Sequence, residues 1–270
     1  MDIHPYAALM RRYCIDYTAV HDLSVCPDIM REDYRVTVSG RTLGMDQYVG
    51  AVEGAFSRFP TLDLTVHDMM ISADRLAMRF SEHGASSRDD GRVAVWRGIS
   101  LYRWDGSRLR TCEVEQDFLS RDRQLTAGTT ARLDPAAPDP WAVTTDEPAN
   151  PEAEQLVRAW FRAWVTGGDR TNLQTADCQL VVDASDLDGP DDLTILDADL
   201  EITDLFSAGA AVAVKAELRG TYGGGLPGVA AQSVGRELVL PLTAIGQVEG
   251  AHLSEMRIIR DRWGLQRRLR

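Results

Sequence analysis

The sequence contains very little lysine. Of its 270 residues 29 are basic, and only Lys215 is a lysine, so the other 28 are arginine. Schiff-base chemistry needs a lysine amine and would therefore depend on Lys215 alone. That residue follows a run of small apolar side chains typical of a buried strand, so we expect no such chemistry.

Cysteine is also scarce. The chain has four cysteines, with no Cys-x-x-Cys pair and no cluster of histidines beside them. A structural zinc site or a disulfide framework needs such spacings, so we expect free thiols, most of them buried, and no bound metal. The four are Cys14, Cys26, Cys112 and Cys178.

Long apolar runs and a signal-peptide pattern are absent as well. No stretch approaches the roughly 20 apolar residues of a membrane-spanning helix, and Met1 to Pro5 lack the basic and apolar regions of a signal peptide. Acidic side chains outnumber basic ones by 41 to 29, a formal net charge of −12. Such a chain repels phosphates, so we expect no nucleic-acid partner, no membrane partner and a cytoplasmic location.

What the chain does have is a stretch rich in Pro, Ala, Thr and Asp between Ala127 and Pro151. Each proline fixes its own φ and moves the residue before it out of the helical region, so residues 127–149 are expected to form an extended linker. This linker would separate one domain at 1–126 from a second at 150–270. Apolar residues make up 44% of the chain, enough for a core in each.

The two halves repeat each other. Each opens with an apolar helix face of the same spacing, at an offset of 147 residues. The residues of this face are Leu9, Met10, Tyr13, Cys14 and Tyr17 in the first half and Leu156, Val157, Trp160, Phe161 and Trp164 in the second. Near the ends, a turn at 105–106 matches one at 249–250, and Asp117 matches Asp261, at an offset of 144. We interpret the halves as two copies of one fold.

Within the first copy the pattern predicts helices first and then consecutive antiparallel strands. A second helix fits residues 45–59, and strands follow near 62–66 and at 75–84, 92–103 and 109–117. This order indicates an α+β layout, with helices packed on one face of a sheet.

Several motifs of the first half occur in a characteristic order. They are Arg41-Thr42-Leu43-Gly44-Met45, Phe56-Ser57-Arg58-Phe59-Pro60, Leu64-Thr65-Val66-His67-Asp68, His83-Gly84, Trp96-Arg97-Gly98-Ile99, Asp105-Gly106 and Asp117. Over most of residues 5–126 they resemble the SnoaL-like polyketide cyclases of the nuclear transport factor 2-like superfamily. Tandem copies also resemble the polyether epoxide hydrolase/cyclases of that superfamily. The second half is a more divergent copy, with its second helix expected to be shortened to the region 189–192.

The resemblance implies two tandem cone-shaped domains, each with helices packed on a curved, mostly antiparallel sheet around an apolar pocket. It also implies that an aspartate on the last strand is the acid/base, without metal or cofactor, and Asp117 matches that position. Where the cyclases often have an assisting histidine, this chain has Ser100. The Asp-Arg-Asp set of the limonene-type epoxide hydrolases is also incomplete, because Ile99 stands two residues after Arg97.

Two groups of side chains in the first half could carry catalysis. Glu113, Glu115 and Asp117 alternate along one strand, so all three project from one face. Their mutual repulsion and partial burial would raise a carboxyl pKa, which suits acid/base catalysis; the alternative is a solvated row paired with arginines. His83, on the strand face of Arg79, could shuttle a proton at the pocket rim or could be a structural histidine.

Other side chains are expected to line the pocket. Ser100 could donate to a substrate oxygen, Trp96 could form an apolar wall, and a tyrosine hydroxyl could polarise a carbonyl, although each could equally belong to an ordinary core. The full predicted substrate-binding set is Ser100, Trp96, Tyr17, Tyr13, Glu115 and Arg79.

The second half offers fewer candidates, namely Asp261, Asp183 and His252. It could have lost its chemistry and still pack on the first copy. Domains of this kind often dimerise through the sheet, so a fused pair could make that dimer within one chain; a homodimer is the alternative.

Three functions fit these patterns. The first is a cofactor-independent enzyme that acts on a hydrophobic, oxygenated small molecule by cyclisation, isomerisation or epoxide opening, with Asp117 as the acid/base and His83 beside it. The second is a module that binds such a molecule without chemistry, and the third is a protein-interaction module. A buried, perturbed acid in an apolar pocket would favour the enzyme.

Overall fold

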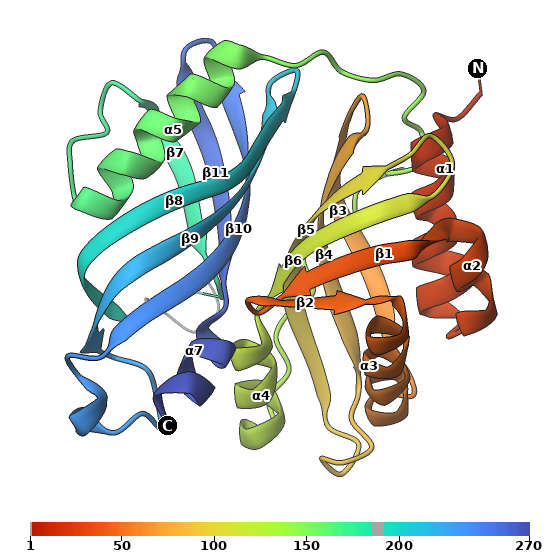
Figure 1. Cartoon of the computed structure of the whole chain (residues 1–270), viewed down its shortest axis with the longest axis horizontal. Coiled ribbons are helices and arrows are strands. Elements are labelled where there is room, and N and C mark those ends of the chain that lie inside the picture. The colour runs from red at the N-terminus through yellow and green to blue at the C-terminus, as the bar shows by residue number, and fades with distance from the viewer. Residues whose placement is uncertain (1, 185–191) are drawn as a thin grey trace. The chain divides into compact units, whose positions relative to one another are not determined.

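The computed structural model of the chain describes residues 2–184 and 192–270. These residues form two compact units, Met1–Glu147 and Pro148–Arg270 (Figure 1). Each unit has its own sheet and is described by itself. Most of the shortened helix expected at 189–192 lies outside the described residues.

The first unit is a six-stranded sheet with helices on one face (Figure 1). Its helical segments are α1 (Pro5–Arg11), η1 (Arg12–Ala19), η2 (Leu23–Val25), α2 (Cys26–Ile29), α3 (Met45–Arg58) and α4 (Phe118–Ala127). Its strands are β1 (Met30–Val38), β2 (Arg41–Gly44), β3 (Asp63–Ser72), β4 (Arg75–Ala85), β5 (Val93–Trp104) and β6 (Leu109–Gln116). The strand order is β2-β1-β6-β5-β4-β3, and only the β1–β6 pair is parallel.

The first helix continues directly into a π-helix, which the sequence pattern did not indicate. The amide of Val20 donates to the carbonyl of Ile15, five residues earlier, as a π-helix requires. In this wider helix Tyr13 and Tyr17 both face the sheet, and their ring centroids lie 5.2 Å apart. π-helical segments are frequent at functional sites, and this one positions two of the predicted substrate-binding residues.

The proline-rich segment is extended, with no helix or strand in residues 128–149. It packs along the first unit as far as Glu147. The amide of Ala137 donates to Val66 O at 2.9 Å, and the His67 ring is hydrogen-bonded to Pro135 O at 2.8 Å. Two apolar side chains of this segment, Trp141 and Val143, also pack against the hydrophobic core of the first unit.

The described part of the second unit has a five-stranded sheet and fewer helices than the first unit (Figure 1). Its elements are α5 (Pro151–Thr166), β7 (Gln174–Val182), β8 (Thr194–Ala208), β9 (Ala211–Gly224), η3 (Ala231–Ser233), β10 (Glu237–Glu249), β11 (His252–Arg260) and α7 (Arg262–Leu269). The strand order is β7-β11-β10-β9-β8, and β7 and β11 are parallel.

The two units share one topology. In both, the last strand lies between a parallel first strand and an antiparallel hairpin partner, followed by the two earlier strands in reverse order. The amide after each last strand bonds to the hairpin partner, Asp117 to Arg97 O and Asp261 to Pro241 O. The α+β fold class and the tandem repeat are therefore confirmed, and the offset of 144 holds through the final hairpin.

Candidate functional site

Three polar side chains meet on the face of the first sheet that the helices cover. The register pairs Glu82 of β4 with Trp96 of β5, and Gln116 of β6 pairs with Gly98, two residues after Trp96 on β5. The Trp96 indole donates to Gln116 Oε1 at 2.7 Å, and Gln116 Nε2 donates to Glu82 Oε1 at 3.3 Å. Gln116 therefore connects the indole to the carboxyl of Glu82.

Glu82 has the electrostatics of an acid/base group. Burial raises the pKa of its carboxyl to about 7, while the positive charge of Arg121 and the hydrogen bonds from Gln116 and Trp96 partly oppose the shift. A carboxyl with a pKa near 7 can both accept and return a proton at neutral pH. Glu82 is therefore the strongest candidate for proton transfer on this face.

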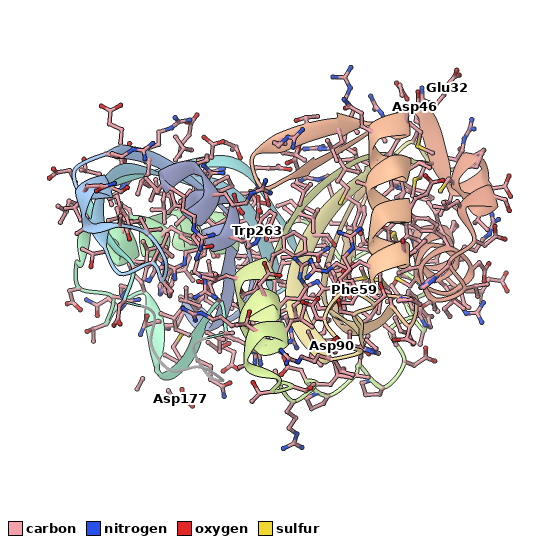
Figure 2. All side chains as sticks on the ribbon, turned by 90° about the horizontal axis from the view of Figure 1, so that it is seen from below. Glu32, Asp46, Phe59, Asp90, Asp177 and Trp263 are labelled. Carbon is pink, nitrogen blue, oxygen red and sulfur yellow. The ribbon has the colours of Figure 1, made fainter. Side chains whose placement is uncertain are left out.

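Arg121 of α4 lies close to this group and is held by aromatic rings. Its guanidinium is 4.5 Å from the ring centroid of Phe118, 5.5 Å from that of Trp96 and 5.7 Å from that of Phe59. Phe59, labelled in Figure 2, is the C-cap residue that directly follows α3. Burial lowers the pKa of Arg121, and hydrogen bonds to Asp122 favour its charge. The aromatic contacts fix a cation near the carboxyl of Glu82.

A chain of three tyrosine hydroxyls crosses the same interior. The hydroxyl of Tyr48, from α3, is 2.9 Å from that of Tyr13 and accepts from that of Tyr17 at 3.1 Å. Burial raises the pKa of Tyr17 far above its ordinary value, and the nearby charge of Glu82 adds to the shift. These phenols are therefore neutral hydrogen-bond donors beside a titratable carboxyl.

Four of the predicted site residues lie on this inner face. They are Tyr13, Tyr17, Trp96 and Ser100. Ser100 is fully buried, and its hydroxyl donates to the carbonyl of Met78 at 3.5 Å. Its register partner on β6 is Val114, whose side chain belongs to the same core. Four of the six predicted substrate-binding residues thus lie on the covered side of the sheet, with Tyr13 and Tyr17 in one core cluster and Trp96 in another.

Strand alternation places the other four on the opposite face. Asp117 is buried, and its Oδ1 accepts from the amide of Ser120 at 3.1 Å, so it caps the N-terminus of α4. Its amide bonds to the carbonyl of Arg97, so it lies in register with Arg97 and not with Trp96. The structure therefore places Asp117 on the opposite face of the sheet from Trp96 and Ser100, and its acid/base role stays a prediction.

His83, Arg79 and Glu115 share that opposite face. The His83 Nε2 lies 3.1 Å from Thr65 Oγ1. Arg79 is paired with Asp68 and Asp134, and Glu115 accepts from a backbone amide in the β1–β2 turn. These contacts tie the three side chains to neighbouring strands and to the proline-rich segment.

In the second unit the three candidates do not form one group. Asp261 caps α7 by accepting from Gly264 N at 2.8 Å, just as Asp117 caps α4. Asp183 is buried after β7 with a φ of +53°, and its Oδ2 accepts from Arg260 Nη2 at 2.6 Å. His252 is exposed at the start of β11.

No group of three or more His, Cys, Asp or Glu side chains within residues 2–184 and 192–270 is arranged to hold a metal ion. Over the same ranges, none of the helices combines the length and the hydropathy of a membrane-crossing segment.

Comparison with known proteins identifies the first unit. Residues 10–111 match the family model of the SnoaL-like domain. The predicted resemblance to SnoaL-like domains is therefore confirmed over these residues, and the second unit repeats the topology of the first. A comparison with curated proteins gave no match.

Solved structures similar to this chain include several proteins described as polyketide cyclases. One from Jannaschia sp. CCS1 is 16% identical, with a TM-score of 0.43, and the alignment covers 46% of this chain and 92% of that one. One from Acidithiobacillus ferrooxidans is 18% identical, with a TM-score of 0.42 and coverages of 48% and 100%. IdmH from Streptomyces antibioticus is 17% identical, with a TM-score of 0.40 and coverages of 46% and 99%.

Sequence reasoning missed the residue that the geometry favours most. Glu82 continues an alternation of apolar side chains on β4, after Met78 and Phe80. A carboxylate in register with an apolar strand face is rare, because burial of a charge is costly. That break in the alternation was the available signal for Glu82.

Proposed function

We propose that the first unit is a cofactor-independent acid/base enzyme that acts on a hydrophobic, oxygenated small molecule, with Glu82 as the acid/base. The observation that carries the proposal is the buried carboxyl of Glu82, with a pKa of about 7, on the tyrosine-rich face of the sheet. The SnoaL-like domain supports a cyclase or isomerase role. Cyclisation, isomerisation and epoxide opening all use such a group.

The reaction would begin with proton transfer from carbon. The Glu82 carboxylate takes the proton from the carbon beside a carbonyl, which leaves an enolate and a neutral Glu82 carboxyl. A hydroxyl of the Tyr13–Tyr48–Tyr17 chain donates a hydrogen bond to the enolate oxygen, where negative charge develops.

The second step decides the class of product. In isomerisation, Glu82 returns its proton to a different carbon of the enolate. In cyclisation, the enolate carbon attacks a second carbonyl of the same molecule, a carbon–carbon bond forms, and Glu82 protonates the resulting alkoxide. In both cases the carboxylate is regenerated, so no cofactor is consumed.

Proton exchange on a simple ketone tests this proposal without knowledge of the natural substrate. We expect the full chain to accelerate deuterium uptake by 2-tetralone in D₂O, followed by NMR, and Glu82→Gln to slow the protein-dependent rate by about 10²–10⁴-fold. Asp117→Asn is the matched control, since it removes a buried carboxylate and keeps a good helix cap.

Each other outcome has a defined meaning. Full activity in Glu82→Gln would contradict the role of Glu82, and loss of activity in a folded Asp117→Asn would assign the acid/base to Asp117, as the sequence predicted. Saturable binding of 2-tetralone by the wild type without exchange would favour the alternative function, a binding module of the same fold.

A further inference from the structure

We infer that the hydroxyl of Tyr34 is a binding position for a neutral oxygen atom of the ligand, a carbonyl or ether oxygen attached to an apolar body. This inference rests on the proposed function, because it names the substrate class of the same interior. It concerns binding alone and therefore has a test of its own.

The observation behind it is an unsatisfied buried hydroxyl. Tyr34, on β1, is 1% exposed, and its hydroxyl makes no hydrogen bond to any residue that the structure describes. A buried donor without an acceptor costs stability, so native proteins contain few of them. The neighbouring hydroxyls of Tyr13, Tyr17 and Tyr48, in contrast, are joined in one chain.

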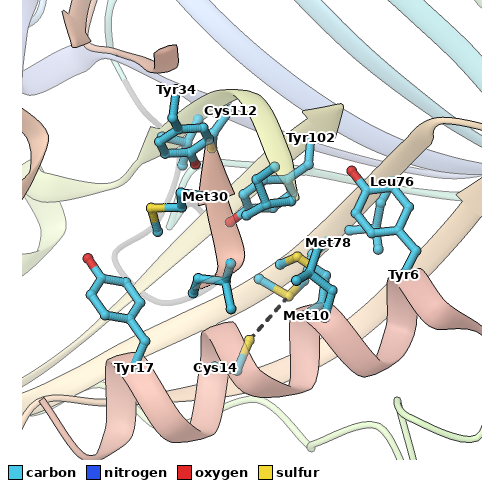
Figure 3. Close-up of a cluster of buried hydrophobic side chains, with 14 of the residues drawn as sticks. Tyr6, Met10, Cys14, Tyr17, Met30, Tyr34, Leu76, Met78, Tyr102 and Cys112 are labelled. Carbon is cyan, nitrogen blue, oxygen red and sulfur yellow. Dashed lines mark hydrogen bonds between the residues drawn. The ribbon is translucent and has the colours of Figure 1, made fainter. Parts of the chain in front are cut away.

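The Tyr34 hydroxyl points into the interior of the unit. Figure 3 shows the hydroxyl ends of Tyr34 and Tyr102 turned toward the space between these two side chains. The ring of Tyr34 also packs edge-on against Tyr48, with centroids 5.7 Å apart. An oxygen bound at Tyr34 would therefore lie beside the hydroxyl chain that reaches toward Glu82.

The walls around Tyr34 define the ligand class. Met10, Met30 and Met78 lie in the same buried cluster, together with Cys112 (Figure 3). Methionine side chains are flexible and can repack around an apolar ligand of irregular shape. Burial raises the pKa of Tyr34 far above its ordinary value, so the phenol is a neutral donor. A neutral acceptor on an apolar skeleton matches these properties, since an anion would lose its hydration here without a counter-charge.

A pair of probes with the same shape isolates the contribution of the oxygen. Acetophenone and α-methylstyrene differ only in a carbonyl oxygen against a methylene group. For each protein the affinity ratio of the two probes is measured by NMR titration. We expect Tyr34→Phe to lower the preference for acetophenone by about 3–10-fold relative to the wild type, the range for one neutral hydrogen bond.

Tyr6→Phe is the matched control. The hydroxyl of Tyr6 is also fully buried and without a partner among the described residues. Tyr6 lies at the start of α1, and its ring stacks on that of Trp104, with the two ring centroids 4.4 Å apart. We expect this variant to keep the wild-type affinity ratio. Both variants should raise Tm, by about 2–4 °C, because each removes an unsatisfied buried hydroxyl.

Three results would overturn the inference. They are an unchanged affinity ratio in Tyr34→Phe, a fall in Tm for that variant, and no saturable binding of acetophenone by the wild type. Failure of the proposed function gives a different pattern, because Glu82→Gln would then keep proton exchange while the Tyr34-dependent affinity ratio persisted.

Discussion

The two units share a fold but not the side chains on the inner face of the sheet. The register makes Leu218 of β9 and Leu240 of β10 the counterparts of Glu82 and Trp96. Both leucines are buried. The acid and the indole of the first unit are thus replaced by a leucine pair in the second.

The same substitution pattern continues along the sheet. Ser100 corresponds to Ala244 and Tyr102 to Gly246 in the hairpin register. The first helices differ in the same direction, since Trp160, the counterpart of Tyr13, is fully buried and donates to Gln174 Oε1 within its own unit. At these matched positions of the described residues, the acid, the indole, the serine and the tyrosines therefore occur in the first unit and not in the second.

What the units do share serves the fold. Asp117 and Asp261 each cap the helix after the last strand and are about equally buried. Each unit also pairs one large with one small side chain at the same place in the sheet. In the first unit the ring of Phe80 on β4 fills the space beside Gly98 on β5, and in the second unit Leu242 on β10 faces Ala216 on β9. A residue repeated at the same offset is therefore evidence for a structural role, and a residue that differs marks where function can lie.

Introducing the acid into the second unit should have the largest effect on stability. Leu218→Glu would bury a charge without a partner among leucines, so we expect the free energy of unfolding to fall by about 3–5 kcal/mol at pH 8. Urea unfolding of the full chain followed by circular dichroism measures this, with Leu218→Met as the control for size. Wild-type stability of Leu218→Glu would show that the second unit tolerates the acid and would remove the contrast between the copies.

The second largest expected effect is a change in the free energy of unfolding with pH, caused by the Glu82 carboxyl of the first unit. Between pH 4.5 and about 7 the unfolded chain has lost the Glu82 proton while the folded chain keeps it, so stability falls as pH rises through this window. The carboxyl of Glu82 is buried, but the residue as a whole keeps some exposure to solvent, so we expect a loss of about 1–3 kcal/mol.

Glu82→Gln should remove this part of the pH dependence and be more stable than the wild type at pH 8. The deuterium exchange rate should follow the opposite trend, rising with pH and levelling above about 7 as the carboxylate forms. The same pH dependence of stability in Glu82→Gln would assign the titration to another group.

The capping aspartates should respond alike in the two units. Asp117→Ala and Asp261→Ala each remove the acceptor for an amide at the start of a helix, so we expect each to lower the free energy of unfolding by about 0.5–2 kcal/mol. Asparagine at either position should restore most of this loss. A much larger effect on exchange activity for Asp117→Asn than for Asp261→Asn would contradict the view that both residues serve the fold.

Local patterns predicted the elements better than they predicted the faces. The helix expected at 45–59 is α3, Met45–Arg58, because its apolar spacing and the proline after it are local signals. The alternation of Glu113, Glu115 and Asp117 is also local, but which face the helices cover depends on strand pairing far along the chain. For that reason the candidate set was divided between two faces, and Glu82 on the covered face was not found.

Removal of one hydroxyl from the Tyr13–Tyr48–Tyr17 chain should have the smallest effect on stability and on proton exchange, and it tests whether this chain distinguishes the first unit from the second. Tyr48→Phe removes the hydroxyl that joins Tyr13 and Tyr17, so we expect the free energy of unfolding to fall by about 1 kcal/mol and proton exchange by a few-fold. Trp164→Phe in the second unit is the control, since Trp164 is the counterpart of Tyr17 and a partner in aromatic stacking. It should leave exchange unchanged. Equal losses of exchange in the two variants would mean that the activity follows general stability, and the hydroxyl chain would then have no role in the reaction.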